Sequence, residues 1–380
     1  MKLSSTENLM YDRQLKLQNV GEKGQLKLKN SKVLVIGAGG LGCPALIYLT
    51  AAGVGTIGIM DFDLVEISNL QRQILFTTND IGKPKAICAS QLLKEKNSLI
   101  QINCYIEKLT VKNAIEIFKM YDIIIDGTDN FESRYLINDA CVLSQKILIY
   151  GSVEKFEGHV SVFNYPLTDE KRSATYRCLF PKPPESLHIN CSDVGVLGVL
   201  PGIVGSIQAT EAIKIILNIG ENLAGKLLMI DALSMQFSKL NIERNELGWK
   251  NFPQTVEQFE EMDYPAFCKL KNSLSNMNCI SAEELFAMIF ENQKFQLIDV
   301  RQPLEQPEFD FYKNLNIPIE SILDRKNEIR SDIPVVFFCS SGERSSQALQ
   351  RLKEHYQMEN LFQLEGGVAE WIKMSTTIKL

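Results

Sequence analysis

The sequence predicts an α/β protein in which a mostly parallel sheet covered by helices is followed by a smaller α/β domain. Apolar runs of strand length alternate with helical patterns from residue 32 to residue 231, and such alternation is typical of parallel sheets covered by helices. A second, shorter alternation occupies residues 281–355. The length of 380 residues is sufficient for two or three domains with separate cores.

The predicted elements can be followed in order from residue 32. Residues 32–37 form a continuous apolar run, as expected of a strand buried on both faces, and residues 41–52 are predicted to form the helix after it. The other predicted strands are residues 56–61, 101–106, 122–126, 147–150, 159–164 and 227–231, with a helix at 131–142. In the second alternation we predict a helix at 281–291, strands at 295–300 and 334–339, and a helix at 345–355.

A polar, irregular stretch separates the two alternations. Pro253 and Pro265 lie in it, and proline disfavours continuous regular structure. We therefore predict an N-terminal domain of residues 1–245, a linker of residues 246–277 and a C-terminal domain of residues 278–380.

The composition is that of an ordinary soluble globular protein, with 45% apolar and 23% charged residues. A formal net charge of -6 argues against a nucleic-acid-binding surface. No apolar run approaches the ~20 residues of a membrane span, and the N-terminus lacks the apolar core of a signal peptide. The nine cysteines have no paired spacing, which fits reduced thiols. We expect a cytoplasmic protein that binds neither membrane nor nucleic acid.

A glycine-rich turn, Gly37-Ala38-Gly39-Gly40-Leu41-Gly42, lies between the first predicted strand and its helix. Glycines in this context permit a tight turn and let a phosphate approach the N–H groups at a helix N-terminus. Asp61 ends the next strand, where a carboxylate can accept hydrogen bonds from ribose hydroxyls. These two features predict a Rossmann-like nucleotide site and by themselves would also fit NAD.

Fixed positive charges follow this turn and favour a triphosphate over a dinucleotide. Asn69 and Arg72 come just after a strand, and Lys85 lies further along the chain. Ligands of open α/β sheets bind at this edge of the sheet. The alternative, that Arg72 and Lys85 are solvated surface charges, is the common state of such residues, but their position at the ligand-binding edge favours phosphate binding.

The segment Asp126-Gly127-Thr128-Asp129-Asn130 follows the strand at 122–126. A carboxylate at this edge can hold Mg²⁺ against phosphate oxygens. The alternative is helix capping, because Thr128, Asp129 and Asn130 are all residue types that cap helices. We expect one of them to cap and assign Asp129 to the metal.

These residues together resemble the MoeB/ThiF adenylyltransferases, relatives of ubiquitin-activating enzymes, over residues 9–243. The resemblance rests on Tyr11-Asp12-Arg13-Gln14, the turn at 37–42, the segment 68–73, Lys85, Asp129-Asn130, Arg177-Cys178-Leu179-Phe180 and residues 202–212. It implies an ATP-dependent enzyme, commonly a homodimer, that adenylates the Gly-Gly C-terminus of a small ubiquitin-like sulfur-carrier protein.

The resemblance also implies a role for each matching position. Arg13 would reach the nucleotide of the partner subunit. Nucleotide contacts would come from Gly37, Gly39, Gly40 and Gly42, ribose contacts from Asp61, phosphate contacts from Ser68, Asn69, Leu70, Gln71, Arg72 and Lys85, and Mg²⁺ binding from Asp129 beside Asn130.

The sequence departs from the family at the structural zinc site, which commonly uses two Cys-x-x-Cys pairs. Here Thr175 and Cys178 stand at the first pair, and residues 242–249 contain no cysteine. We therefore predict that structural zinc is absent. The resemblance implies that Cys191 takes part in sulfur handling, although a buried structural cysteine is the alternative.

A second reactive site is predicted in the C-terminal domain, where Cys339-Ser340-Ser341-Gly342-Glu343-Arg344-Ser345 joins a strand to a helix. Successive N–H groups leading into a helix lower the pKa of a thiol and can hold a persulfide, and Arg344 would add positive charge. With Leu297-Ile298-Asp299-Val300-Arg301 and the segment 364–371, this loop resembles a rhodanese domain, in which Cys339 would carry sulfur.

The leading hypothesis is a bifunctional enzyme that adenylates a MoaD-like carrier and delivers persulfide sulfur from Cys339, giving a thiocarboxylate for molybdopterin synthesis. Arg13, Arg72, Cys191 and Cys339 are its predicted catalytic residues, and a desulfurase or thiosulfate would donate the sulfur. The same chemistry could serve a ThiS-like carrier in thiamine thiazole synthesis. A third hypothesis, an NAD oxidoreductase, gives Arg72, Lys85 and Asp129 no role. A non-catalytic binding protein is less favoured still, because every expected active-site position carries the expected residue.

Overall fold

The computed structural model describes residues 2–169, 171–183, 195–245, 248, 252–268, 278–303, 305, 312–340 and 342–378. The chain divides into two compact units near residue 270, and each is described by itself. Cys191 and Ser341 lie outside the described residues.

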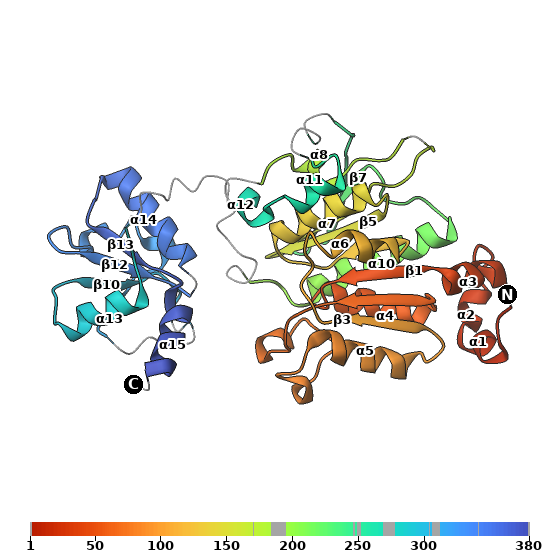
Figure 1. The fold of residues 1–380 in the computed structure, drawn as a ribbon, viewed down its shortest axis with the longest axis horizontal. Helices are drawn as coiled ribbons and strands as arrows, with labels where there is room; N and C mark the ends of the chain where they lie inside the picture. Colours follow the sequence, from red (N-terminus) through yellow and green to blue (C-terminus); the bar gives the residue numbers. More distant parts are fainter. Residues whose placement is uncertain are drawn as a thin grey trace. The chain divides into compact units, whose positions relative to one another are not determined.

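An eight-stranded sheet organises the first unit, in the order β3-β2-β1-β4-β5-β6-β7-β8 (Figure 1). The strands from β3 to β5 pair in parallel, and those from β5 to β8 pair antiparallel. The strands are β1 (Lys32–Ile36), β2 (Thr56–Met60), β3 (Gln101–Tyr105), β4 (Ile123–Asp126), β5 (Ile147–Glu154), β6 (Glu157–Phe163), β7 (Lys226–Asp231) and β8 (Gln236–Asn241). The mostly parallel α/β class is confirmed.

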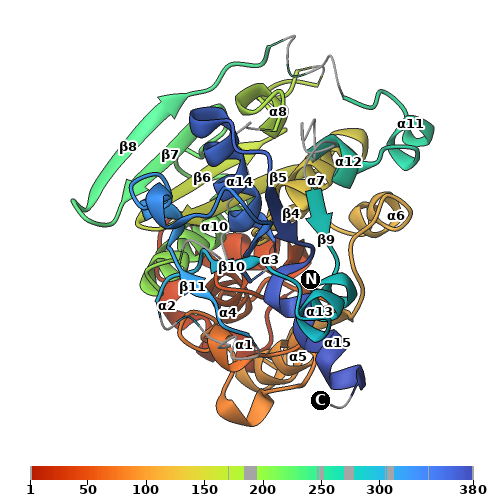
Figure 2. The same cartoon turned by 90° about the vertical axis from the view of Figure 1, so that its left-hand side faces the viewer.

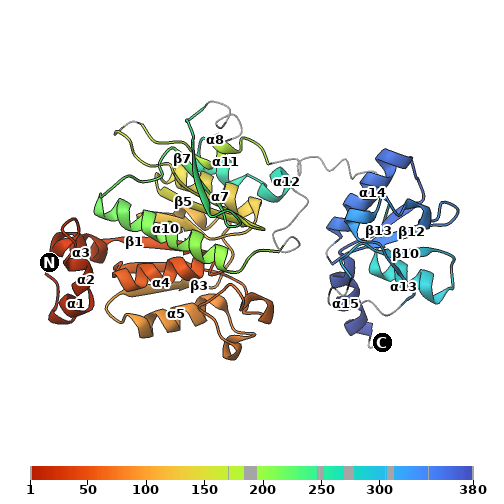
Figure 3. The same cartoon turned by 180° about the vertical axis from the view of Figure 1, so that it is seen from behind.

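Helices cover both faces of this sheet. On one face lie α4 (Gly42–Ala52), α5 (Lys85–Lys96) and α10 (Val199–Leu217), seen from outside in Figure 3. The other face carries α6 (Ala114–Lys119), α7 (Phe131–Leu143) and α8 (Tyr176–Leu179). Further helical segments of the first unit are α1 (Ser5–Met10), α2 (Asp12–Leu15), α3 (Gly21–Asn30), η1 (Ile67–Asn69) and η2 (Thr78–Asp80).

β1 is the centre of the core because both of its faces are covered. Val33 and Val35 pack on the side of α4 and α10, and Leu34 and Ile36 on the side of α6 and α7. α10 is long and apolar enough to cross a membrane, with a mean hydropathy of 1.3. It packs instead against α4, β5 and β6, and buries Gln208 and Glu211.

The strand β8 was not predicted from the sequence. Its side chains are mostly exposed and it pairs only with β7 among the described strands, at the antiparallel edge of the sheet (Figure 2). A strand with little buried apolar surface lacks the alternation on which sequence prediction depends.

Part of the predicted linker is folded. Within residues 252–268 the chain forms α11 (Val256–Glu260) and α12 (Tyr264–Cys268). Phe259 and Tyr264 are buried in the core on the α7 side. This segment therefore belongs structurally to the first unit, because its aromatic side chains complete that core.

The second unit is a smaller, wholly parallel sheet with the order β11-β10-β12-β13-β9. Its helix α14 covers one face, and α13 and α15 cover the other. The elements are β9 (Asn278–Ile280), α13 (Ala282–Phe290), β10 (Gln296–Asp299), β11 (Leu315–Asn316), η5 (Ile319–Ser321), η6 (Lys326–Glu328), β12 (Val335–Phe338), α14 (Glu343–Tyr356), β13 (Leu361–Leu364) and α15 (Gly367–Ile378).

Candidate functional sites

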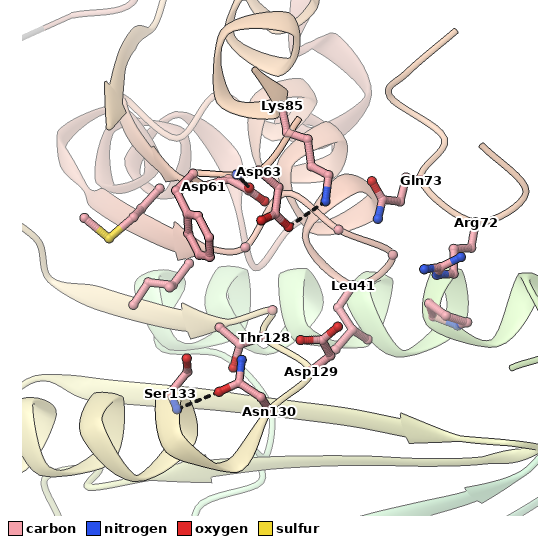
Figure 4. Close-up of a pocket in the computed structure, with 18 of the residues that line it drawn as sticks. Leu41, Asp61, Asp63, Arg72, Gln73, Lys85, Thr128, Asp129, Asn130 and Ser133 are labelled. Atoms are coloured by element: carbon pink, nitrogen blue, oxygen red, sulfur yellow. Dashed lines mark hydrogen bonds and ion pairs between the residues drawn. The ribbon is translucent and has the colours of Figure 1, made fainter. Parts of the chain in front are cut away.

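A cavity of about 410 Å³ lies in the first unit, at the carboxyl ends of β1, β2 and β4 (Figure 4). Asp61, Asp63 and Lys85 line one side of it, and Thr128, Asp129 and Asn130 face them from the other. The predicted residues that line it are Gly37, Gly39, Gly40, Asp61, Gln71, Arg72, Lys85, Asp129 and Asn130. The structure therefore brings most of the predicted site together.

The glycine turn depends on residues without a Cβ. Gly37 has a φ of 90°, and a Cβ on it would lie 2.7 Å from the carbonyl oxygen of Gly127. A Cβ on Gly42 would overlap the carbonyl oxygen of Gly37. Gly42 does not line the cavity; it permits the close turn from β1 into α4.

Asp61 holds the glycine turn in place. Its carboxylate accepts hydrogen bonds from the backbone N–H of Ala38 at 2.7 Å and of Asp63 at 2.9 Å. Burial raises the pKa of Asp61, and the nearby Lys85 partly offsets this effect. The side chain thus orders the turn and, at the cavity wall, remains placed to contact a sugar.

Lys85 begins α5 and is buried, and its ammonium group forms an ion pair with Asp63 at 2.9 Å. Asp63 is 51% exposed. A phosphate that approaches Lys85 would therefore compete with a solvated carboxylate. Asp63 was not predicted to be a site residue, although it lies only two residues after Asp61 in the sequence.

The segment at 67–73 supplies only part of the predicted phosphate contacts. Gln71 and Arg72 line the cavity, whereas Ser68, Asn69 and Leu70 do not. The Asn69 side chain is buried and accepts a hydrogen bond from the Glu66 N–H at 3.2 Å. Arg72 donates to the Ser68 carbonyl at 3.0 Å. Ser68 and Asn69 therefore shape the loop that carries Arg72.

The capping and metal roles at the start of α7 are divided between two neighbours. Asn130 caps the helix, accepting a hydrogen bond from the Ser133 N–H at 2.9 Å. Asp129 is exposed at the cavity, and within the described part of the chain its carboxylate has no hydrogen-bond partner. Asp129 is consequently available to a cation.

Asp126, which precedes the cavity residue Gly127, and Arg134, which lines the cavity, were not predicted from the sequence to be binding residues. Asp126 is buried, which raises its pKa, and one oxygen accepts hydrogen bonds from the N–H and hydroxyl of Thr128 at 2.9 and 2.6 Å. Arg134 lines the cavity and lies over the rings of Phe131 and Tyr150. The sequence signal that could have indicated Arg134 is its position four residues after Asn130, at the start of the predicted helix, because residues four apart lie on the same face.

Arg13 lies apart from the cavity of its own chain. It is exposed on α2 and is not one of the cavity residues. Its neighbour Gln14 donates to the carbonyl of Ala52, which ends α4, whereas Gly42 begins α4 beside the glycine turn. The helix α4 is ~16 Å long at 1.5 Å per residue, so Gln14 and its neighbour Arg13 lie about one helix length from the glycine turn.

Hydrogen bonds connect the segment at 175–178 to Asn245 and Gly248, where the family commonly has zinc. Cys178 accepts a hydrogen bond at Sγ from the Thr175 N–H at 3.4 Å. The Asn245 side chain donates to the Cys178 carbonyl and accepts from the Gly248 N–H, each at 3.0 Å. Among the described residues, no group of three or more metal-binding side chains is found.

Beside these hydrogen bonds lies a fully buried ion pair. Arg177 on α8 donates to both carboxylate oxygens of Asp139 on α7, at 2.8 and 2.6 Å. Tyr264 on α12 donates to the same carboxylate at 2.7 Å. The guanidinium also lies over the rings of Tyr135 and Phe267. This cluster attaches α12 to the scaffold of the first unit.

In the second unit, Cys339 follows β12 directly and is completely buried. Its sulfur accepts a hydrogen bond from the Gly342 N–H at 3.2 Å and lies 3.8 Å from the Ser345 hydroxyl oxygen. Gly342 adopts a φ of 94° and precedes α14. The backbone thus presents an N–H donor and a helix N-terminus to the sulfur.

The rest of the rhodanese-like motif supports this loop. The Val368 N–H donates to the Cys339 carbonyl at 2.9 Å, and a Cβ on Gly367 would overlap that carbonyl oxygen. Arg301 pairs with Asp299 at 2.8 Å and lies over the Phe338 ring. Both predicted motifs therefore hold the end of β12, from which Cys339 emerges.

Arg344 does not face the sulfur as an isolated positive charge, in contrast to the expectation from the sequence. It forms a two-point ion pair with Glu305, at 2.8 and 2.6 Å. Glu305 also accepts a hydrogen bond from the Ser340 hydroxyl at 2.8 Å. The side chain of Glu343 is outside the described part.

A glycine turn with cations and a carboxylate at a Rossmann-like edge, together with a separate cysteine loop, defines an adenylyltransferase combined with a sulfurtransferase. Comparisons with known families agree with this class. Residues 11–249 match the ThiF family, and residues 281–374 match the Rhodanese-like domain. The chain belongs to the ThiF family and carries a C-terminal rhodanese domain.

Two of the relatives compared match nearly the whole chain. The chain is 40% identical over 378 residues to the probable adenylyltransferase/sulfurtransferase MoeZ of Mycobacterium tuberculosis, covering 98% of this chain and 94% of the relative. It is 37% identical to adenylyltransferase and sulfurtransferase MOCS3 of Drosophila persimilis, covering 97% and 84%. A sulfur carrier protein adenylyltransferase of Thermus thermophilus is 46% identical over 272 residues, which cover 71% of this chain and all of the relative.

Among solved structures, E. coli MccB with SeMet MccA resembles the chain with a TM-score of 0.55 and 25% identity. The similarity covers 64% of this chain and 74% of that one. It supports the fold of the adenylyltransferase part.

Proposed function

We propose that this enzyme adenylates the C-terminal Gly-Gly carboxylate of a small ubiquitin-like sulfur carrier and then converts it to a thiocarboxylate. The observation that carries the proposal is the coexistence of a glycine-lined cavity with Arg72 and Lys85 at the edge of the first sheet and a buried cysteine loop in the second unit. The carrier is suggested by the sulfur carrier protein adenylyltransferase of Thermus thermophilus.

The cavity is suited to adenylation because its charges can meet those of ATP. The carrier carboxylate attacks the α-phosphorus, the bond to the β-phosphate breaks, and pyrophosphate leaves with the electron pair. Arg72 and Lys85 would stabilise the phosphates, while the glycine turn admits them close to the backbone. No side-chain base is required, since the carboxylate is already ionised and catalysis is mainly positioning.

Mg²⁺ fits the residues present. This ion is commonly held by one or two carboxylates together with substrate phosphates. Asp129 offers an exposed carboxylate at the cavity. When bound, Mg²⁺ would neutralise phosphate charge, and Asp129 would hold it on the side of the cavity opposite Lys85.

A homodimer would complete the site. Arg13 is exposed and separated by the length of α4 from its own glycine turn, and we infer that it would contact the nucleotide of a neighbouring copy. A cation from the partner subunit would add to Arg72 and Lys85 as charge develops on the phosphates.

Sulfur transfer would follow at Cys339. The terminal sulfur of its persulfide attacks the acyl adenylate carbon, AMP leaves, and an acyl disulfide joins the carrier to Cys339. A second thiolate, for which Cys191 is our candidate, then attacks the Cys339 sulfur and releases the thiocarboxylate. The resulting disulfide returns to thiols by exchange with a dithiol reductant.

We assign the thiocarboxylate to molybdopterin synthesis through a MoaD-like carrier, in the cytoplasm, with sulfur supplied by a desulfurase or thiosulfate. The similarity to MoeZ and MOCS3, which are named adenylyltransferase and sulfurtransferase, supports the combination of the two activities on which this assignment depends. A ThiS-like carrier for thiamine thiazole synthesis is the second candidate, because the carboxylate chemistry is the same for both. An NAD oxidoreductase is disfavoured by Arg72, Lys85 and Asp129.

The test is ATP–pyrophosphate exchange with the full chain, Mg²⁺ and each candidate carrier. We expect exchange only with a carrier that ends in Gly-Gly, and none with the same carrier lacking these two residues. Exchange that is independent of any carrier, or reduction of NAD, would overturn the proposal.

A further inference from the structure

The ion pair at the cysteine loop suggests how the second unit selects its sulfur donor. Arg344 is the only lysine or arginine in the segment from Cys339 to Ser345. Both of its terminal nitrogens bind the Glu305 carboxylate, and one also donates to the Ser340 hydroxyl at 3.0 Å. Glu305 comes from a segment far from the loop in sequence, so only the fold brings it there.

The pair leaves the loop without net positive charge. Arg344 is 14% exposed and Glu305 27% exposed, so solvent screens the pair only in part. The hydrogen bonds from Arg344 lower the pKa of Glu305 to about 2, and the carboxylate is therefore charged at neutral pH.

We propose that Glu305 is a specificity-determining residue of sulfur uptake, which disfavours small anionic donors such as thiosulfate and favours a persulfide presented on a protein cysteine. This inference rests on the proposed role of Cys339 as sulfur acceptor. A persulfide donor carries at most one charge on the reacting sulfur and can bind through protein surface. Thiosulfate carries two charges and depends on cations for binding.

The chemistry at Cys339 is the same for both donors. With thiosulfate, the Cys339 thiolate attacks the sulfane sulfur, the sulfur–sulfur bond breaks, and sulfite leaves with the electron pair. With a protein persulfide, the donor thiolate leaves instead. Cyanide then removes the sulfur as thiocyanate and restores the thiolate. Only the charge of the donor distinguishes the two reactions.

The test compares kcat/KM for thiosulfate in the thiosulfate:cyanide reaction of the full chain with that of Glu305→Gln. This substitution keeps the size of the side chain and removes its charge. We expect kcat/KM to rise about tenfold, mainly through KM, and the gain to shrink at high salt. The rate of persulfide formation on Cys339 with L-cysteine and a cysteine desulfurase, measured by mass spectrometry of the chain, should change less than twofold.

Two further variants isolate the charge. Glu328→Gln removes a carboxylate from an exposed pair with Arg325 in the same unit, and should leave kcat/KM for thiosulfate unchanged. Glu305→Gln combined with Arg344→Gln should lose the gain. If Glu305→Gln lowers both reactions in parallel, or if the wild type already uses thiosulfate as well as the variant does, the inference is overturned. The second result would leave the proposed sulfur transfer intact.

Discussion

The nucleotide cavity and the cysteine loop both lie where strands of a parallel sheet end, but they are assembled over different distances in the sequence. The cavity draws Gly37, Asp61, Lys85 and Asp129 from separate βα connections. The sulfur of Cys339 is held by its own loop, through the Gly342 N–H and the start of α14. A large polyanionic substrate requires charges from several elements, whereas one sulfur atom can be held by consecutive backbone groups.

Charge is also used differently at the two sites. In the cavity, Lys85 is paired with a half-exposed Asp63, and Asp129 has no partner among the described residues. In the loop, Arg344 is paired with the partly buried Glu305. The first arrangement leaves charge available to a ligand, and the second withholds it. The two activities should consequently be separable by mutation.

The largest effect is expected for Cys339→Ser. This variant should lose sulfurtransferase activity and thiocarboxylate formation to background, because the persulfide has no other carrier, while carrier-dependent pyrophosphate exchange remains near wild type. The measurement is the mass of the carrier after one turnover. Cys279→Ser, at an exposed cysteine of the same unit, is the control. A carrier that is fully ~16 Da heavier after reaction with Cys339→Ser would rule out the relay.

Cys191→Ser tests the candidate for the release step. We expect it to spare exchange and to lower the yield of thiocarboxylate, with the carrier retained on Cys339 as an acyl disulfide. Non-reducing electrophoresis would detect that adduct. Release at the wild-type rate would assign the second thiolate to another group.

Arg177→Met tests the long-range assembly of the first unit. Breaking its buried ion pair with Asp139 should lower the free energy of unfolding of this unit by about 3–5 kcal/mol. The thiosulfate:cyanide activity of the second unit should persist, because its loop is built locally. Urea unfolding gives the stability, and Lys119→Met, from an exposed pair with Glu116, should cost less than about 0.5 kcal/mol. Equal losses for the two variants would contradict the role of burial.

Asp129→Ala should lower pyrophosphate exchange on the order of 10²-fold, because Mg²⁺ would lose its protein ligand. Activity at Cys339 should not change. Glu116→Ala, which removes an exposed carboxylate elsewhere in the first unit, is the control. Exchange at full rate in Asp129→Ala would refute the metal assignment.

A smaller effect is expected when the pH is lowered, because the ion pair between Glu305 and Arg344 then loses its contribution to stability. Because the Arg344 pair lowers the pKa of Glu305 from 4.5 to about 2, its stabilisation is complete above pH 4.5 and is lost as the pH falls toward 2. The wild type should exceed Glu305→Gln in the free energy of unfolding by about 1 kcal/mol or less near neutral pH. The difference should vanish toward pH 2, as measured by urea unfolding of the second unit. A difference that stays constant with pH would argue against the ion pair.

Much of the molecule could be predicted because the signals are contiguous. The strand at 32–36 and the turn at 37–42 need no distant information, since apolar runs and glycines act locally. The cysteine loop at 339–345 could likewise be predicted from its own residues. The ends of α4, α7 and α14 differ from prediction by one or two residues, whereas β8 was missed because its side chains are exposed.

The sequence by itself determined the fold class, the family and the residue types available at each site. Only the tertiary structure decided which of these residues meet. It paired Lys85 with Asp63 and Arg344 with Glu305, and it placed Asn245 against Cys178. The physical reason is that a local pattern sets the conformation of its own segment, while a partner tens of residues away is chosen by the packing of sheets and helices.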